Sequence, residues 1–337
     1  TLCVLALGGL GISMMKVTGN IAGDLPQEDV ILADLHWFED RFGGVMPFEV
    51  VVQTNKPGKV TQLAFLKKVE RLQKVLAEEP QISRSVSLVD GLKLAKQGFF
   101  QGTPSRYSLP SRREQSFMGP YLSGTAGGGI GGDGKFVDSA RSTIRVSAQV
   151  ADIGTQEMNA LTDRLQPRLD SIFPPEEHRV FMTGTSVVFV EGTTYLVKNL
   201  LVSLMLAVLV IATVMSILFR SARMVAISLL PNLVPLIFTA AVMGFFGIAL
   251  KPSTLLVFSI AFGISVDDTI HLLAKYRQEL DLHGWNMREA VLLAVRETGV
   301  SMMYTSIVLF FGFMMFSASD FEGTRALGVL VSTTLLV

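Results

Sequence analysis

Two neighbouring acidic residues, Asp267 and Asp268, lie in an otherwise apolar stretch of the chain. They fall about thirteen residues into an expected membrane span over 254–276, and a helix rises about 1.5 Å per residue, so both acids should lie near mid-membrane. One carboxylate at that depth costs at least about 2.5–3.5 kcal/mol, and two adjacent carboxylates disfavour joint ionisation. The pair is therefore expected to take up and release protons.

Other polar residues are spaced so that they could join this pair. His271 follows Asp267 by four residues and Asp268 by three, so it shares their helical face, and imidazole titrates near neutral pH. The next expected span, 300–318, begins with several hydroxyl groups, on Ser301, Tyr304, Thr305 and Ser306. If the two spans pack as antiparallel neighbours, these hydroxyls approach the acids, which predicts a proton or cation site inside a helical bundle.

The acid pair has other interpretations. The helix could end at the membrane surface near Asp267 and leave both acids in water, but 254–266 alone would span only about 20 Å, too short to cross. The pair could also serve a structural contact with another helix. An aspartyl protease is disfavoured because its two carboxylates normally lie on different helices, and His36 and His178 show no metal-ligand or triad spacing. We therefore do not expect an enzyme.

The composition supports a membrane protein. The chain has 337 residues, of which 49% are hydrophobic and 17% charged, against about 25% charged in a typical soluble domain. Lys+Arg and Asp+Glu both number 29, so no basic excess indicates a nucleic-acid partner. The one cysteine, Cys3, forms no intrachain disulfide and no cysteine metal cluster. No cofactor or metal is expected.

Long charge-free stretches predict six membrane spans. Between 199 and 266 the charged residues are Arg220, Arg223 and Lys251, and roughly 20 apolar residues suffice to cross a bilayer. The expected spans are 1–16, 196–219, 224–250, 254–276, 300–318 and 323–337, the first and last truncated. Pro231 and Pro235 should interrupt the span over 224–250. The segment 277–298 is amphipathic and predicts a helix on the cytoplasmic surface of the bundle, which covers 195–337.

The distribution of basic residues sets the orientation. Two connections on one side carry six of them, and the opposite short loops carry two. The six are Arg220, Arg223, Lys275, Arg277, Arg288 and Arg296, and the two are Lys251 and Arg325. This predicts that the large segment 17–194 lies outside the cytoplasm.

Residues 17–194 predict an α+β domain. Helical spacing appears over 26–42, 59–79 and 155–173, and strand-like patterns over 47–54, 82–89, 143–150 and 179–182. The order gives two βαβ units with helices on one sheet face. Between them, 98–135 is rich in Gly, Ser and Pro and predicts a mobile insertion. Its GTAGGGIGGDG stretch lacks the Gly-Lys-Ser/Thr ending of a phosphate loop.

Four segments together resemble a known family. They are GISVDDTIHLLAKYRQEL (263–280), GNIAGDLPQEDVILADLHWFEDRFGG (19–44), LFRSARMVAISLLPNLVPL (218–236) and RETGVSMMYTSIVLFFGF (296–313). With the order of one span, a large external domain and five spans, the chain resembles one half of a resistance-nodulation-division (RND) transporter, looking like the C-terminal half. The closest likeness is to the MMPL-like exporters, which are related to Patched and the sterol-sensing-domain proteins.

The resemblance implies a function and a set of site residues. It implies export of lipids or other hydrophobic compounds driven by the proton-motive force, with a porter-like domain in the periplasm of a bacterial inner membrane. By position, Asp267, Asp268 and His271 match the proton relay, and Thr305 and Ser306 match the hydroxyls of the neighbouring helix. The implied partners are the N-terminal half of the transporter, the cargo and protons, and a homodimer or homotrimer is compatible with the family.

The sequence leaves two other functions open. Sterol-sensing-domain relatives suggest a lipid sensor or receptor that transports nothing, and a SecDF-like relative would assist protein translocation. Collapse of the proton gradient should stop an exporter but leave ligand binding by a sensor intact. Crosslinking of the external domain to unfolded chains rather than to lipids would favour the translocation factor.

Overall fold

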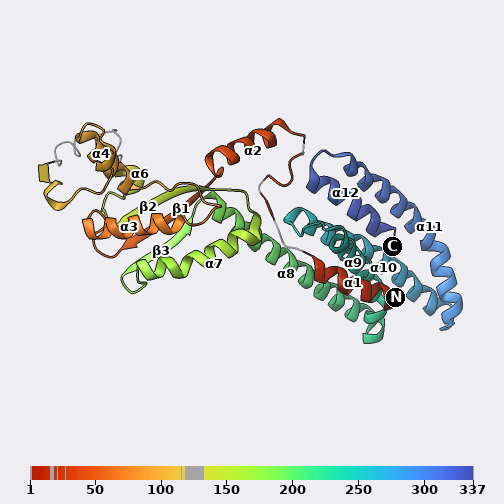
Figure 1. Cartoon of the computed structure of the whole chain (residues 1–337). Helices are drawn as coiled ribbons and strands as arrows, with labels where there is room; N and C mark the ends of the chain where they lie inside the picture. The colour runs from red at the N-terminus through yellow and green to blue at the C-terminus, as the bar shows by residue number, and fades with distance from the viewer. Residues whose placement is uncertain are drawn as a thin grey trace. The chain divides into compact units, whose positions relative to one another are not determined.

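The computed structural model describes residues 2–15, 19–20, 22–26, 28–114, 116–117 and 133–336 (Figure 1). The chain divides into a membrane unit, Thr1–Gln27 with Gly192–Val337, and an α+β unit, Glu28–Glu191. The division falls inside one long helix, α8 (Thr185–Phe219). The glycine-rich centre of the expected insertion, 118–132, lies outside the described residues.

The α+β unit is built on a three-stranded antiparallel sheet. Its strands are β1 (Met46–Thr54), β2 (Thr143–Val150) and β3 (His178–Thr183), in the order β2-β1-β3. In the register, Val50 of β1 lies opposite Val146 of β2 and Met182 of β3. The strands expected over 47–54, 143–150 and 179–182 are therefore confirmed.

The strand expected over 82–89 is wrong. Ile82 and Val86 make only isolated bridges to β2, and helix α4 (Leu88–Phe99) begins directly afterwards. The Ser87 side chain accepts the Val89 N–H, and Asp90 completes a capping box with Ser87. Because a capping box favours a helix start, the alternation that predicted a strand is overridden at Ser87.

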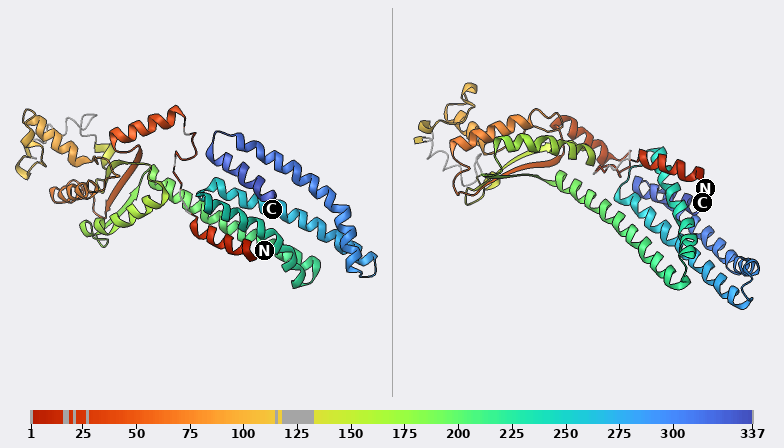
Figure 2. Two further views of the ribbon diagram at one scale, coloured as in Figure 1. Left: turned by 45° about the vertical axis from the view of Figure 1, so that its right-hand side comes forward. Right: turned by 90° about the horizontal axis from the view of Figure 1, so that it is seen from below.

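One face of the sheet carries the core of the α+β unit. Alternate residues of β1 are buried, and α3 (Leu63–Leu76) and α7 (Gly154–Ile172) cover that face (Figure 2). The unit also contains α2 (Val30–Phe42), the short helix α6 (Asp133–Phe136) and the 3₁₀ turn η1 (Pro104–Arg106). Strands β2 and β3 are not neighbours, and α7 connects them, so β2, α7 and β3 form one split βαβ unit with β1 between the two strands.

One histidine is buried in this core. The ring of His178 packs edge-on against Phe65 and Phe173, with ring centroids 5.6 and 5.7 Å away. Burial, followed by the charges of Lys59 and Lys68, lowers the pKa of His178 below its ordinary value. The imidazole is therefore held neutral in the folded unit.

The membrane unit consists of helices. They are α1 (Leu2–Met14), α8, α9 (Ala222–Phe246), α10 (Pro252–Leu282), α11 (Met287–Met314) with its 3₁₀ end η2 (Met315–Ala318), and α12 (Glu322–Leu335). Within the described residues, four helices are long and apolar enough to cross a membrane, over Thr185–Ile217, Arg223–Phe246, Pro252–Leu282 and Met287–Ala318. Spans at α1 and α12, with 13 and 14 residues, stay predictions.

The amphipathic helix expected over 277–298 is not a separate element. Residues up to Leu282 extend α10, and residues from Met287 belong to α11. The turn between them places Gly284 and Trp285 at positive φ of 62° and 68°, and Asn286 caps α11 with its side chain. Glycine at positive φ stops a helix and asparagine starts one, which explains the division.

Glycines allow α1 to pack closely on α9 (Figure 1). A Cβ on Gly244 would lie 1.8 Å from the carbonyl oxygen of Gly11, and one on Gly11 would lie 2.5 Å from Cα of Ala241. The two backbones are thus in contact, as small residues permit in membrane helix pairs. Helix α10 in turn contacts α9, α11 and α12, so it lies at the centre of the unit.

Candidate functional site

Helix α10 carries both intramembrane acids in its interior. It runs unbroken from Pro252 to Leu282, so fourteen residues follow Asp268 before the helix ends. The interpretation in which the helix ends near Asp267 is therefore wrong. Helical backbone satisfies its own hydrogen bonds, so the chemistry at this level depends on side chains, among them those of Asp267 and Asp268.

Asp267 and His271 form a side-chain pair on one face of α10. Nε2 of His271 lies 3.4 Å from Oδ1 of Asp267, and their side chains are 70% and 71% exposed. Asp268 is partly buried. The opposite, bundle-facing side of α10 carries Phe262 and Val266, both buried. The pair therefore faces away from the other described helices, and a carboxylate in contact with an imidazole can hold one proton between them.

A buried polar cluster joins α9 to α10 beside the acids. Asn232 on α9 is buried, and its Oδ1 accepts hydrogen bonds from Oγ of Ser265 at 2.7 Å and Oγ1 of Thr269 at 2.8 Å. Its Nδ2 donates to the carbonyl of Ser228 at 2.9 Å. Because Thr269 directly follows Asp268, this cluster links the acid-bearing turn of α10 to the neighbouring helix.

Asn232 was not predicted as a site residue, although its sequence context carries a signal. Asn232 is an amide within an apolar span, directly after Pro231 and three residues before Pro235. Both prolines lack an N–H group, yet α9 stays helical through them, so the expected interruption of this span is wrong. The hydroxyl of Thr239 donates to the Pro235 carbonyl at 2.9 Å, one turn after the second proline.

Thr305 and Ser306 lie on α11, which packs against α10. Nζ of Lys275 on α10 lies 2.6 Å from Oε2 of Glu297 on α11. Asp267 precedes Lys275 by eight residues on α10, and Thr305 follows Glu297 by eight residues on α11. Because the two helices run antiparallel, Asp267 and Thr305 lie at a similar level. The Thr305 hydroxyl donates to the Ser301 carbonyl at 3.0 Å, and no hydrogen bond between described residues joins it to either acid.

A second charged group marks the start of α10. Lys251, the N-cap residue, places Nζ 2.9 Å from Oδ1 of Asp24 and 3.6 Å from Oε2 of Glu322. It also donates to the carbonyl of Gly23 at 3.2 Å. These contacts tie the segment after α1 to the first turns of α10 and α12, beside a cavity of about 370 Å³.

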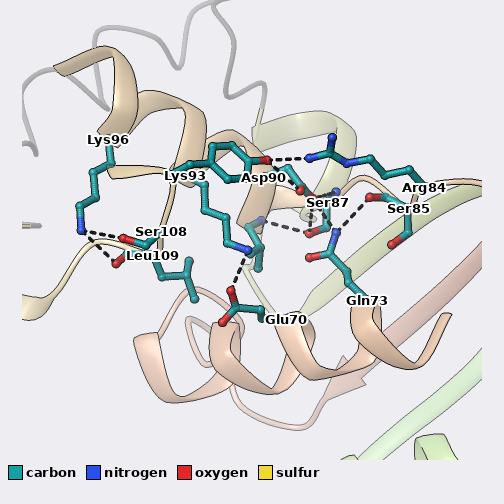
Figure 3. Close-up of polar contacts among 12 residues, drawn as sticks. Glu70, Gln73, Arg84, Ser85, Ser87, Asp90, Lys93, Lys96, Ser108 and Leu109 are labelled. Atoms are coloured by element: carbon teal, nitrogen blue, oxygen red, sulfur yellow. Dashed lines mark hydrogen bonds and ion pairs between the residues drawn. The ribbon is translucent and has the colours of Figure 1, made fainter. Parts of the chain in front are cut away.

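The α+β unit has its own polar cluster between α3 and α4 (Figure 3). Nζ of Lys93 lies 2.7 Å from Oε1 of Glu70, and Gln73 donates to Asp90 and to the carbonyl of Ser85. A cavity of about 420 Å³ lies beside them. The contacts satisfy one another and fix the start of α4.

No group of three or more His, Cys, Asp or Glu side chains suited to a metal ion occurs in the part of the chain that the structure describes.

The first part of the expected insertion is tied to α4. The buried ammonium of Lys96 donates to Oγ of Ser108 at 3.1 Å and to Oε2 of Glu114 at 3.0 Å. The Ser111 backbone N–H, followed by Lys96, lowers the pKa of Glu114 to about 2. Residues 108–114 are thus tied to α4 by a partly buried ion pair, and the mobility expected over 98–135 stays a prediction.

The apolar spans and the bundle around α10 define an integral membrane protein. The sequence model of the MMPL family matches residues 52–337, so the chain belongs to the MMPL family, whose members are RND-like membrane transporters rather than enzymes. The chain is also 25% identical over 320 residues to the "Putative membrane protein MJ1562" of Methanocaldococcus jannaschii, a match covering 90% of this chain and 77% of that protein. Both comparisons agree with the resemblance seen in the sequence.

Proposed function

We propose that this MMPL-family protein exports lipids or other hydrophobic compounds across a cytoplasmic membrane, driven by protons that bind Asp267 and Asp268. One observation carries the proposal: an acid pair with His271 on one face lies inside a membrane-crossing helix. Intramembrane ionisable residues are costly and mark ion or proton pathways. The outward position of the α+β unit, predicted by the basic residues, belongs to the same proposal.

The uncovered face of α10 is part of this proposal. An exposed carboxylate such as Asp267 is not stable against lipid tails, and the described helices of the membrane unit leave it exposed. We include a second helical bundle that covers this face, in the same protein or in a partner chain. Thr305 and Ser306 on α11 then supply hydroxyls at the level of the acids.

The proton gradient provides enough energy for such export. One proton crossing about 150 mV releases roughly 3.5 kcal/mol, scaled from about 2.3 kcal/mol per 100 mV. At about 1.4 kcal/mol per tenfold change, this supports a cargo gradient of a few hundredfold. Protonation would neutralise the acid-bearing face of α10 and so allow α10 to move. Because the hydroxyls of Ser265 and Thr269 donate to Asn232 on α9, a movement of α10 would be passed to α9.

A reconstituted transport assay tests the proposal. The full-length protein is placed in vesicles with a fluorescent lipid, and lipid transfer to a soluble acceptor is followed with and without a pH gradient. Asp267→Asn combined with Asp268→Asn should abolish gradient-dependent transfer and proton flux. Asp281→Asn, an exposed acid at the end of the same helix, is the matched control and should transport normally.

Each outcome of that assay has a consequence. Full gradient-dependent transfer by the double variant would refute the role of the acids. Lipid binding by the wild-type protein without any gradient-dependent transfer would refute export and favour the lipid sensor. Loss of transfer in the Asp281→Asn control as well would show that the assay reports general damage to α10, and the proposal would fail for lack of a specific effect.

A further inference from the structure

Helix α2, the first helix of the α+β unit, exposes an unusual apolar face. Five of its thirteen residues are large, apolar and exposed. They are Val30, Ile31, Trp37, Phe38 and Phe42, with exposed fractions from 51% to 72%. Surface helices normally turn their apolar face toward the core, and contiguous exposed apolar patches mark interaction sites. We call these five residues the aromatic face of α2.

The helix is held firmly, so this exposure is not the result of fraying. Asp29 caps α2 by accepting the Ile31 N–H at 2.8 Å, and Gly43 ends it at φ 70°. The other side of the helix buries Leu32, and Oε1 of Glu39 accepts the Asp152 N–H at 2.6 Å. The aromatic face therefore points outward from a helix that is fixed to its own unit.

The aromatic side chains form one cluster. The ring centroids of Trp37 and Phe38 lie 5.5 Å apart, and those of Phe38 and Phe42 lie 4.9 Å apart and stacked. The guanidinium of Arg41 lies 4.9 Å from the Trp37 ring centroid. Tryptophan, phenylalanine and a neighbouring arginine are the residues that populate the layer between lipid tails and water.

The connection to the membrane unit is short. Asp29, the N-cap residue of α2, follows Asp24 by five positions in the chain. Asp24 is bound by Lys251 at the start of the membrane-crossing helix α10, and its carbonyl accepts the Glu322 N–H at 3.2 Å. The chain thus passes from a point fixed at the start of a membrane-crossing helix to the N-cap of α2 within five residues.

We propose that α2 docks its aromatic face into the interfacial layer of the lipid bilayer, so that the partner of this surface is the membrane itself. Interfacial helices bury their apolar side roughly 5–10 Å into the boundary between headgroups and tails. Asp29, Asp34, Glu39 and Asp40 outnumber Arg41 in this segment, so apolar burial in zwitterionic lipid, rather than attraction to anionic lipid, provides the affinity. This proposal does not depend on proton coupling or on the nature of the cargo.

The two tryptophans of the chain make a direct test practical. Trp285 is exposed and sits at φ 68°, a conformation that asparagine tolerates, so Trp285→Asn should fold and leaves Trp37 as the single tryptophan. The full chain is reconstituted in phosphatidylcholine vesicles that contain lipids brominated on the acyl chains. Trp37 emission should be strongly quenched by the brominated lipids and only weakly by aqueous iodide.

A matched pair of variants shows whether the aromatic face is responsible. In the single-tryptophan protein, Phe38→Ser with Phe42→Ser should lower quenching by the brominated lipids and raise quenching by iodide. Phe117→Ser, which removes an exposed phenylalanine elsewhere in the α+β unit, should change neither. Circular dichroism and the size-exclusion profile confirm that each variant is folded.

Two results would overturn the proposal. Strong iodide quenching of Trp37 without quenching by brominated lipids would place the aromatic face in water. Weak quenching by both reagents would show that protein, such as a second copy of the chain, covers it. If the Trp285→Asn protein does not fold, the wild-type chain and Trp37→Phe are compared instead, and the difference between their quenching reports Trp37.

Discussion

Replacement of Asn232 by leucine should measurably destabilise the membrane unit. The side chain is buried, and its Oδ1 accepts the hydroxyls of Ser265 at 2.7 Å and Thr269 at 2.8 Å across the α9–α10 interface. Leucine has a similar size but no acceptor. Interhelical hydrogen bonds in membranes are worth about 0.6 kcal/mol on average and at most about 1.7 kcal/mol. Two such hydrogen bonds are lost, so we expect the free energy of unfolding to fall by about 1–2 kcal/mol. The hydrogen bond from the Thr269 hydroxyl to the Ser265 carbonyl, at 3.0 Å, remains and limits the loss.

The assay is reversible unfolding of the full chain in mixed micelles with increasing SDS, followed by far-UV circular dichroism. Asn199→Leu, at an exposed position of α8, is the matched control and should leave the free energy of unfolding nearly unchanged. A double-mutant cycle with Ser265→Ala isolates the contact. Since independent sites add to within about 0.3–0.5 kcal/mol, additive effects of the two substitutions, or an Asn232→Leu variant as stable as the wild type, would refute the reasoning.

Two further predictions concern packing and pH. Gly244→Ala should lower the free energy of unfolding by about 1–3 kcal/mol, because its Cβ would lie 1.8 Å from the Gly11 carbonyl oxygen. Gly9→Ala is the control and should be tolerated, because its Cβ would meet nothing within 4 Å. Thermal unfolding in detergent compares the two variants. The folded state lowers the pKa of His178, so as the pH falls the unfolded chain takes up a proton at a higher pH than the folded chain does. The stability of the α+β unit should therefore fall as the pH drops below about 6.5. His178→Phe should remove this part of the pH dependence and the exposed control His36→Phe should not, as measured by hydrogen exchange of β3; an unchanged profile in His178→Phe would contradict the assignment.

Some elements could be predicted because their signals are local. Charge-free apolar runs predicted the helices α8 to α11, since a membrane span has no other requirement than length and apolarity. Strand-like patterns predicted β1, β2 and β3, and alternate residues are buried in β1 and β2. The prediction failed over 82–89, where the Ser87 capping box starts α4, and over 277–298, where Gly284 and Asn286 end one helix and start another. These are single-residue effects on backbone conformation that a periodicity does not contain.

For the candidate site, the spacing of Asp267 and His271 along one helix was enough to predict that they share a face, because the helical repeat alone decides it. Which neighbours that face meets was not predictable, since it depends on the rotation of α10 against α9, α11 and α12. In the packed bundle Val266 is buried and Asp267 is exposed, and the buried Asn232 accepts the hydrogen bonds of Ser265 and Thr269. The sequence by itself determined that carboxylates stand inside an apolar helix; only the tertiary structure decided which side of the bundle they face, because contacts between helices arise from the shapes of many side chains at once.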